Sequence, residues 1–568
     1  MKKFIPAMVA IVLIFVIVGA WAGTKVYEKY SYSDERADLE QYFEIDTDDG
    51  VAIVLQDEKI AEQAKIIDGI YYLDLASVHK YLNERFYWDG NESLLIYTTP
   101  TDMITSVVGS SAYTAEGAEQ TENYVISVQE GEILYVALDY VKKYTNFSYE
   151  AFSTPNRMQM YTVWGEQTVA EIGKDTAVRF QGGVKSEILT NLVAGDKVVV
   201  LEEMENWSKV KTNDCYIGYV ENKRLKNIAQ EQQVPVTDYE EPVYTNIKKD
   251  YKISLMWHQI YRQEANANLD NVMAGVSGVN TISPTWFSLS DNQGNFNSFA
   301  SSDYVAKAHA KGLEVWAMVD NFNYAHNYDA DVSTQEVLSY TSKRQYLIDG
   351  LVNTALAYGI DGLNIDFEGI PAETGPHFIQ FIRELSIKCR EKGLVLSVDN
   401  YVTNSGTDYY EREEQGNVVD YFIIMGYDEH WRGCGTAGSV ASIHFVDEGI
   451  AKTLEDVPAE KVINAVPFYT LVWRTDGGET TDETLTMANT GAYIDRNGLT
   501  PTWDEETCQN YVEFEEGNAL YQVWFEDVES LQVKLNVMNK HALAGVAGWS
   551  LGLQSKDVWP LFEAYINS

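Results

Sequence analysis

From residue 250 to the end of the chain, β-like runs alternate with helical patterns, and this alternation constrains the fold more than any other feature. Strands separated by helices pair in parallel, because each helix returns the chain to the starting edge of the sheet. Eight such units over about 320 residues predict an α/β TIM (β/α)8 barrel. The expected strands are 253–257, 281–286, 314–319, 362–367, 395–398, 421–426, 462–467 and 546–551.

The interval between the seventh and eighth expected strands is too long for a single helix. Residues 474–525 therefore predict a small α+β insertion that overhangs the mouth of the barrel. Its expected strands are 511–514 and 521–525, and the whole barrel domain is expected to span 250–568.

The fourth expected strand has an unusual distribution of polar residues. Side chains alternate between the two faces of a strand, so the apolar residues at 363, 365 and 367 share one face. Asn364, Asp366 and Glu368 share the other face, which points into the barrel. Burying unpaired carboxylates costs several kcal/mol or shifts their pKa strongly. Because a closed parallel barrel has no exposed edge strand, these acids indicate an active site.

The run from Asp361 to Glu368 resembles the Asp-Gly-x-x-x-Asp-x-Glu signature of glycoside hydrolase family 18. Met425-Gly426-Tyr427-Asp428, after the sixth strand, resembles the Met-x-Tyr-Asp element of that family. Trp549, at the end of the eighth strand, resembles the tryptophan below the reacting sugar. All three segments lie at the carboxyl ends of strands, where active sites of this fold occur.

The resemblance implies substrate-assisted retaining hydrolysis, in which the 2-acetamido oxygen of the sugar attacks the anomeric carbon. Glu368 would protonate the leaving oxygen and then deprotonate the incoming water. Asp366 would orient the acetamido N–H, and Tyr427 would hold the acetamido oxygen in place. Trp549 would stack beneath the sugar ring. The substrate would carry an N-acetyl group, and no metal or organic cofactor would be required.

Asn364 departs from the commonest chitinase pattern, which has a third inward aspartate at this position. A neutral amide removes one like charge, so we expect Asp366 to ionise more readily than in those chitinases. The Asn-Ile-Asp-Phe-Glu form resembles the branch of the family that acts on bacterial cell wall and spore cortex. The runs 427–431 and 438–441 resemble the same branch.

Further candidate substrate-binding residues follow other strands. We expect Asp361, Asn364, Met425 and Asp428 to contribute to binding. Trp257 ends the first strand and Asn321 follows the third, where each could line the sugar cleft or pack at the top of the barrel. The runs 320–322 and 399–401 are placed in the same way.

The N-terminus indicates export. Lys2 and Lys3 precede an uncharged run, 4–24, that is long enough to cross a bilayer as a helix. Ala20-Trp21-Ala22 fits a signal-peptide cleavage site, whereas the length of the run favours an uncleaved membrane anchor in segment 1–24. Either interpretation places the rest of the chain outside the cytoplasmic membrane, behind a polar stalk at 25–41.

Two small domains are expected between the stalk and the barrel. Segment 42–165 contains a duplicated strand–helix–strand pattern, an α+β module that resembles copper amine oxidase N-terminal-like domains but holds a single histidine, His79. Segment 166–228 has short strands broken by turns and resembles the bacterial SH3-like domain, a small β-barrel often attached to cell-wall enzymes. A linker with Pro235 and Pro242 is expected at 229–249.

The composition excludes some classes of partner. The net charge of −43 disfavours nucleic acid and anionic lipid headgroups as ligands of the exported part. The four cysteines are widely spaced and predict no zinc site.

The sequence therefore predicts an extracytoplasmic glycoside hydrolase that cleaves β-1,4 bonds of N-acetylglucosamine-containing glycans, with peptidoglycan as the expected polymer. Two alternatives remain open at this point. One is a chitinase-type enzyme acting on another N-acetylglucosamine polymer, and the other is a non-catalytic surface protein that only binds glycan. The presence of Glu368 argues against the second alternative.

Overall fold

The computed structural model describes residues 5–234, 237, 239–322, 332–404 and 406–568. Lys2 and Lys3, before the apolar run, and Pro235, in the expected linker, lie outside the described residues. Contacts divide the chain into two compact units. The first comprises Met1–Phe86, Ser106–Tyr113 and Glu119–Glu241; the second comprises Tyr87–Thr105, Thr114–Ala118 and Pro242–Ser568.

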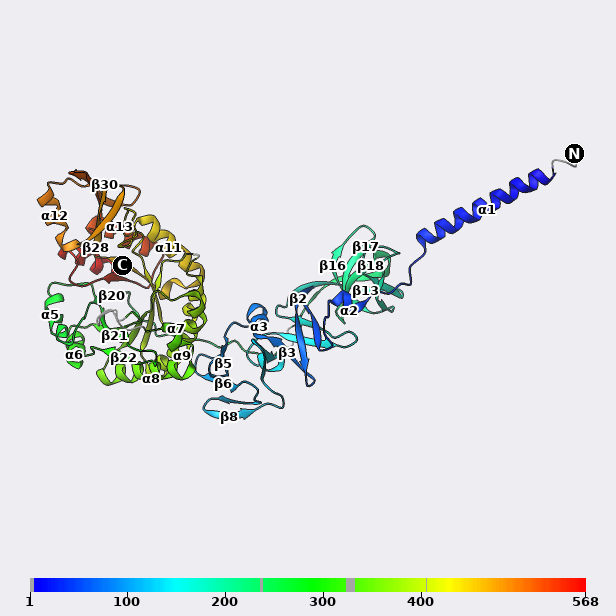
Figure 1. Ribbon diagram of the computed structural model, residues 1–568, viewed down its shortest axis with the longest axis horizontal. Coiled ribbons are helices and arrows are strands. Elements are labelled where there is room, and N and C mark those ends of the chain that lie inside the picture. The colour runs from blue at the N-terminus through cyan, green and yellow to red at the C-terminus, as the bar shows by residue number, and fades with distance from the viewer. Residues whose placement is uncertain (1–4, 235–236, 238, 323–331, 405) are drawn as a thin grey trace. The chain divides into compact units, whose positions relative to one another are not determined.

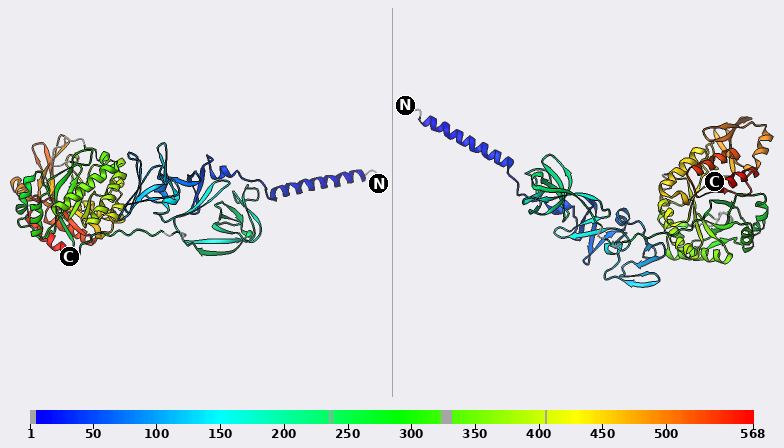
Figure 2. Two further views of the ribbon diagram at one scale, coloured as in Figure 1. Left: turned by 90° about the horizontal axis from the view of Figure 1, so that it is seen from below. Right: turned by 180° about the vertical axis from the view of Figure 1, so that it is seen from behind.

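The apolar N-terminal run forms one unbroken helix, α1 (Ile5–Tyr30) (Figures 1 and 2). Its most apolar 18-residue window has a mean hydropathy of 2.6, and none of that window is buried. Length and composition suffice for a membrane span, a property that N-terminal signal sequences share.

The first unit begins with a mixed seven-stranded sheet in which the duplicated pattern is visible. β3 runs directly into the short helix α3 (Leu75–Tyr81), and β10 runs into α4 (Leu138–Val141). These two strands pair antiparallel, with Tyr135 opposite Asp74. In spatial order the strands are β11 (Ser148–Phe152), β12 (Arg157–Tyr161), β1 (Gly50–Leu55), β2 (Glu58–Ile67), β3 (Ile70–Asp74), β10 (Ile133–Ala137) and β9 (Ser127–Glu130).

The second sheet of this unit also has seven strands and encloses its own apolar core. Val178, Val198, Val210 and Val220 come from four of its strands and are buried together. In spatial order the strands are β15 (Ile188–Leu192), β14 (Thr176–Arg179), β18 (Ile217–Glu221), β17 (Trp207–Thr212), β16 (Lys197–Glu203), β13 (Glu166–Ile172) and β19 (Leu225–Gln232). This is the small β-barrel expected at 166–228.

The second unit is built on the expected barrel. Eight parallel strands close on themselves, because β20 pairs with both β21 and β33 (Figure 1). The short strand β22 (Phe296–Ser298) adds antiparallel to β21. The barrel strands are β20 (Ile253–His258), β21 (Thr281–Leu289), β23 (Glu314–Asp320), β24 (Gly362–Asp366), β25 (Val395–Tyr401), β26 (Tyr421–Met425), β27 (Val462–Pro467) and β33 (Gly545–Trp549).

Helices surround these strands, and the largest apolar core lies between the two layers (Figure 1). Leu363, Ile365 and Phe367 belong to this core, and Phe367 stacks on Phe381 at 5.5 Å. The alternation expected for β24 is therefore confirmed. The helices are α5 (Leu269–Val272), α6 (Ser302–Ala310), α7 (Thr334–Leu338), α8 (Thr341–Tyr358), α9 (Gly375–Lys392), α10 (Arg412–Val418), α11 (Ile443–Asp456), α13 (Val528–Lys540) and α14 (Trp559–Ile566).

Two segments from outside the barrel pattern complete this unit. Residues from β4 (Phe86–Asp89) and β5 (Leu94–Thr98) pack on α8 and α9, where Asp89 accepts hydrogen bonds from the backbone and hydroxyl of Thr341. Between β27 and β33, a five-stranded antiparallel sheet forms with α12 (Thr490–Asn497). Its order is β29 (Glu479–Thr486), β28 (Tyr469–Asp476), β32 (Ala519–Phe525), β31 (Gln509–Glu516) and β30 (Thr502–Asp504).

Candidate active site

Glu368 stands two residues beyond β24, at the carboxyl end of the barrel, and its backbone is held by the residue that follows the neighbouring strand β23. The Asn321 side chain accepts from the amide of Glu368 at 2.8 Å and donates to the Glu368 carbonyl at 2.9 Å. The Tyr401 hydroxyl, from the end of β25, donates to Glu368 Oε2 at 2.9 Å. Asn321 therefore fixes the main chain of Glu368 and Tyr401 fixes its carboxyl group.

Asp366 belongs to a cluster of carboxyl groups with Asp320, Glu368 and Asp399. It is buried, and its Oδ1 has no hydrogen-bond partner among the residues that the structure describes. Burial raises the pKa of Asp366 well above its usual value, and the charges of Glu368, Asp399 and Asp320 add to the rise. An unpaired buried oxygen facing a cleft is available to a ligand donor.

The cluster also shifts the pKa of Glu368. Burial raises the pKa, the Tyr401 hydrogen bond opposes the rise, and the charges of Asp428 and Asp320 add to it. A carboxyl group with a raised pKa keeps its proton closer to neutral pH, which is the state that a general acid needs.

Asn364 is held inside the barrel by hydrogen bonds at both ends of its amide group. Its Nδ2 donates to Asp399 Oδ1 at 2.8 Å, and its Oδ1 accepts from the indole N–H of Trp257 at 2.9 Å. The pKa of Asp366 is raised even with a neutral amide at position 364, because Asp399 and Asp320 supply like charges. The comparison of Asp366 with chitinases that carry a third inward aspartate stays a prediction.

Asn364 and Trp257 do not reach the sugar cleft. Both side chains are buried inside the barrel, where Trp257 packs with other inward apolar residues and lies 5.7 Å from the ring of Trp549. They support the floor of the site from below. Of the two roles expected for Trp257, lining the cleft or packing in the barrel, the structure shows packing.

Above this floor lies a chamber of about 560 Å³ at the mouth of the barrel. Its lining combines carboxyl groups with aromatic rings, as expected for a site that binds sugars. Tyr469, the first residue of β28, donates its hydroxyl to Asp428. The lining residues are Phe322, Asp366, Glu368, Gly369, Tyr401, Met425, Tyr427, Asp428, Tyr469 and Trp549.

The family profile described as glycosyl hydrolases family 18 matches residues 236–554, more than half of the chain. The chain belongs to glycosyl hydrolase family 18. It is therefore a glycoside hydrolase by family, and the three segments that resembled the family do lie around one chamber. A second profile, described as bacterial SH3 domain, matches residues 174–226, so the small β-barrel of the first unit is an SH3-like domain.

Relatives of this family 18 chain include proteins from Bacillus species. It is 25% identical over 292 residues to a Bacillus subtilis (strain 168) protein named uncharacterized glycosylase YvbX, covering 50% of this chain and 83% of that protein. It is 27% identical over 246 residues to the cortical fragment-lytic enzyme of Bacillus anthracis. That match covers 41% of this chain and 56% of the relative, so the chain spans about half of that enzyme.

A solved structure with the same fold is the chitinase from Chromobacterium violaceum ATCC 12472. It aligns with a TM-score of 0.50 and 23% sequence identity, covering 56% of this chain and 99% of that chain. At this level of identity the likeness concerns the fold alone.

Asp361, the first residue of the family 18 signature, lies away from the chamber. It precedes β24 and therefore stands at the amino end of the barrel, where it accepts from Val315 N at 2.7 Å and contacts His309 Nε2 at 2.8 Å. The structure does not bring Asp361 to the substrate cleft, because strand direction places it at the opposite end. Its hydrogen bonds join β23 and α6 to β24.

Several chamber residues were not among the expected site residues. Tyr401 and Phe322 lie in the runs that the sequence marked as strand ends, but neither was chosen from its run. The expected strand at 395–398 continues to Tyr401, and this extension carries Asp399 and Tyr401 inward with Ser397. Tyr469 belongs to no sequence motif. The feature that could have indicated it is an aromatic residue two positions after the seventh strand.

Proposed function

We propose that the chain hydrolyses the β-1,4 bond that follows N-acetylglucosamine, by substrate-assisted catalysis with retention of configuration. The observation that carries this proposal is that Glu368, Asp366, Tyr427 and Trp549 line one chamber at the mouth of the barrel. These groups suit an N-acetylated sugar, because its acetamido group needs a donor, an acceptor and an apolar platform at once.

In the proposed reaction Glu368 gives its proton to the glycosidic oxygen while the acetamido oxygen bonds to the anomeric carbon. The leaving sugar departs with that proton, and a cyclic oxazolinium intermediate remains. Water then attacks the same carbon, Glu368 accepts the proton of the water, and the ring opens. The raised pKa of Glu368 supports the first step, in which this residue must be protonated.

Asp366 would stabilise the intermediate. Its unpartnered Oδ1 can accept the acetamido N–H. Positive charge that develops on the acetamido group lowers the pKa of a neighbouring carboxyl group, so Asp366 can carry a negative charge when it is needed. Tyr427, whose hydroxyl stays protonated because burial raises its pKa well above the usual value, can donate to the acetamido oxygen.

We infer that the polymer is peptidoglycan. The match to proteins named cortical fragment-lytic enzymes supports a bacterial wall polymer over chitin. The SH3-like domain and the apolar N-terminal helix support work outside the cytoplasmic membrane, with the helix as an anchor. The second candidate is a chitinase-type activity, because the proposed mechanism requires only an N-acetylated sugar and chitin also supplies one.

Glu368→Gln tests the proposed function. We expect the variant to lose turnover by about 10³-fold or more, because glutamine cannot give up a proton, and to keep its affinity for glycan. The assay incubates the full chain with purified sacculi and counts new reducing ends.

The identity of the new reducing-end sugar then decides the bond. N-acetylglucosamine at that position agrees with the proposal, and muramic acid contradicts it. Hydrolysis by Glu368→Gln at the wild-type rate would rule out the assigned acid. Wild-type protein that binds sacculi but releases no reducing ends would make the chain a glycan-binding protein.

A further inference from the structure

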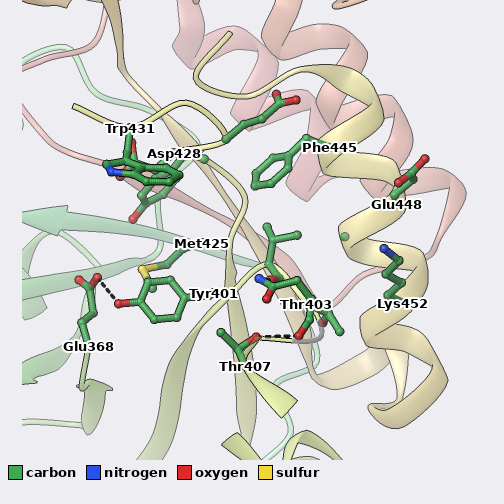
Figure 3. Close-up of a pocket in the computed structure, with 15 residues that line it drawn as sticks. Glu368, Tyr401, Thr403, Thr407, Met425, Asp428, Trp431, Phe445, Glu448 and Lys452 are labelled. Carbon is green, nitrogen blue, oxygen red and sulfur yellow. Dashed lines mark hydrogen bonds between the residues drawn. The ribbon is translucent and has the colours of Figure 1, made fainter. Parts of the chain in front are cut away.

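A second cavity adjoins the chamber and extends from Glu368 to helix α11. It has a volume of about 700 Å³, and we call it the α11 pocket. Figure 3 shows Phe445 and Lys452, from α11, on one side of the pocket and Glu368 with Tyr401 on the other. Asp366 and Trp549 line the chamber but not this pocket.

The proposed function determines which part of the substrate meets the α11 pocket, and the inference below rests on it. Asp366 and Trp549 would hold the sugar whose anomeric bond breaks, so that sugar occupies the chamber. Glu368 lines both cavities and protonates the oxygen between the two sugars. The α11 pocket therefore lies on the leaving-group side of Glu368.

The leaving sugar of peptidoglycan differs from that of chitin at one carbon. It is joined through its O4, and its neighbouring C3 carries a lactyl ether that ends in a carboxylate or in a peptide. This branch starts one carbon away from the bond to the oxygen that Glu368 protonates. The corresponding sugar of chitin has only a hydroxyl group there. An enzyme for the branched polymer needs a side cavity beside its acid, and the α11 pocket lies in that place.

Lys452 is the cationic member of the described residues that line the α11 pocket. It is exposed, and no ion pair or hydrogen bond joins it to the part of the chain that the structure describes. Glu429 and Glu448 also line the pocket, and Glu448 lies one turn before Lys452 on α11. Among the described residues, neither of these acids pairs with Lys452, which is the positive charge that can offset them for an anionic ligand. An ammonium group left unpaired at a cavity wall is available to a ligand carboxylate.

The walls of the pocket suit a peptide-like branch in other respects. Val402 and Phe445 offer apolar surface, and Thr403 and Asn404 offer hydrogen-bonding groups. Trp431, at the rim, exposes 57% of its surface. A mixed lining of this kind binds amides and short aliphatic side chains.

We propose that the α11 pocket receives the lactyl branch of the leaving sugar and that Lys452 pairs with a carboxylate on that branch. The carboxylate has two sources. It is the acid of the lactyl group itself in strands without peptide, or a carboxylate of the stem peptide in strands that keep it.

The experiment measures kcat/KM of the full chain in detergent on three substrates. These are glycan strands that carry stem peptides, the same strands after enzymatic removal of the peptides, and N-acetylglucosamine oligomers. Lys452→Met should lower kcat/KM about threefold to tenfold on branched strands and leave the oligomers unaffected. A lower kcat/KM on peptide-free strands would identify the lactyl carboxylate as the partner of Lys452. A lower kcat/KM only on peptide-bearing strands would identify a carboxylate of the stem peptide.

Two further variants control the test. Lys452→Arg should keep most of the activity, because it retains the charge. Lys556→Met removes an exposed lysine that lines neither cavity and should change nothing. An equal loss on all three substrates, or no loss on any, would overturn the role of Lys452.

Failure of the proposed function is distinguished by the wild-type enzyme. If the wild type cleaves only the N-acetylglucosamine oligomers, both the proposal that the substrate is peptidoglycan and the proposal that the α11 pocket receives the lactyl branch are overturned. If the wild type cleaves none of the substrates, binding of Glu368→Gln to the three substrates is compared with binding of Glu368→Gln combined with Lys452→Met. If the double variant binds branched strands more weakly than Glu368→Gln does, and binds the oligomers equally well, the role of Lys452 is supported although no cleavage is seen. Equal binding of all three substrates by the two variants overturns that role.

Discussion

The hydroxyl of Tyr401 regulates the proton of the proposed acid, Glu368. Burial raises the pKa of Glu368, and the 2.9 Å hydrogen bond from Tyr401 opposes that rise by stabilising the charged form. Tyr401→Phe should therefore raise the pKa of Glu368 further. Because rate is lost as pH rises through this pKa, the alkaline limb of kcat/KM against pH should move to higher pH, with the maximum reduced about tenfold or less.

A neighbouring tyrosine provides the matched control. The hydroxyl of Tyr409 donates to the Ile370 carbonyl at 2.8 Å and does not line the chamber. Tyr409→Phe removes the same atom from the same wall of the barrel and should leave the pH profile unchanged. A Tyr401→Phe profile that stays in place or moves to lower pH contradicts the role given to Tyr401.

Asn364 acts on the stability of the barrel through Asp399. Asn364→Asp keeps the acceptor for Trp257 but replaces the donor to Asp399 with a second buried carboxyl group. We expect a loss of about 2 to 4 kcal/mol in the free energy of unfolding at neutral pH. Burial already raises the pKa of Asp399, and the new neighbour raises it further.

The sign of the pH dependence follows from proton binding. An acid with a raised pKa binds more protons in the folded than in the unfolded chain. It therefore lowers the free energy of unfolding increasingly as pH rises above the pKa of an aspartate in the unfolded chain, which is near 4. Denaturant unfolding at pH 4 and pH 7 should show a smaller loss for Asn364→Asp at pH 4. The same loss at both values would mean that the lost hydrogen bond alone is responsible.

At the scale of elements, α8 and α9 are joined by an ion pair that water does not reach. Arg344 Nη2 lies 2.9 Å from Glu384 Oε1, and both side chains are fully buried. Glu384→Met leaves the guanidinium buried without its charge partner, and we expect a loss of about 3 to 5 kcal/mol in unfolding free energy. Arg344→Met combined with Glu384→Met should cost less than the sum of the two single variants.

This double-mutant cycle compares the wild type, the two single variants and the double variant by chemical denaturation, with a signal that reports unfolding of the barrel unit. A loss below about 1 kcal/mol for Glu384→Met would show that water or another group replaces the partner. The Arg344 side chain also contacts the hydroxyl of Tyr87 at 3.1 Å, so the pair supports the segment that packs on these helices.

The strands of the barrel could be predicted because their evidence is local. Alternation within β24 is enough to place Asp366 and Glu368 on the inner side and Phe367 under the helices. The neighbours of these acids across the sheet could not be predicted in the same way. Asp320 lies opposite Asp366 only because β23 and β24 pair in one register, and register depends on the packing of the whole barrel.

Two candidate site residues lie outside the chamber, for different reasons. Asp361 was chosen because it belongs to the signature, although the direction of β24 already places it at the amino end of the strand. Trp257 was undecided, because an indole at a strand end can face the cleft or fill the barrel. In the structure the Trp257 indole fills the barrel interior, where its N–H donates to Asn364.

At the scale of the whole molecule, we propose that the N-terminal helix is a membrane anchor. The uncharged run of 4–24 corresponds to about 32 Å of helix, which matches the apolar thickness of a bilayer, about 30 Å. It exceeds the apolar core of a typical signal peptide, about 7 to 15 residues. In the structure, α1 continues without a break through Lys25 and Glu28 to Tyr30. These features favour an anchor that keeps the barrel beside the membrane.

The anchor predicts that the full chain keeps its N-terminal segment. After expression in a Gram-positive host, alkaline carbonate should leave the protein in the membrane fraction, and mass spectrometry should find peptides from the apolar run. Ala22→Leu, which destroys the small-x-small pattern, should not change the length of the protein, because no cleavage occurs there. A mature N-terminus at Gly23, lost in the Ala22→Leu variant, would instead make the protein secreted. A secreted enzyme could reach glycan strands far from the membrane, whereas the anchored enzyme is confined to strands within reach of its stalk.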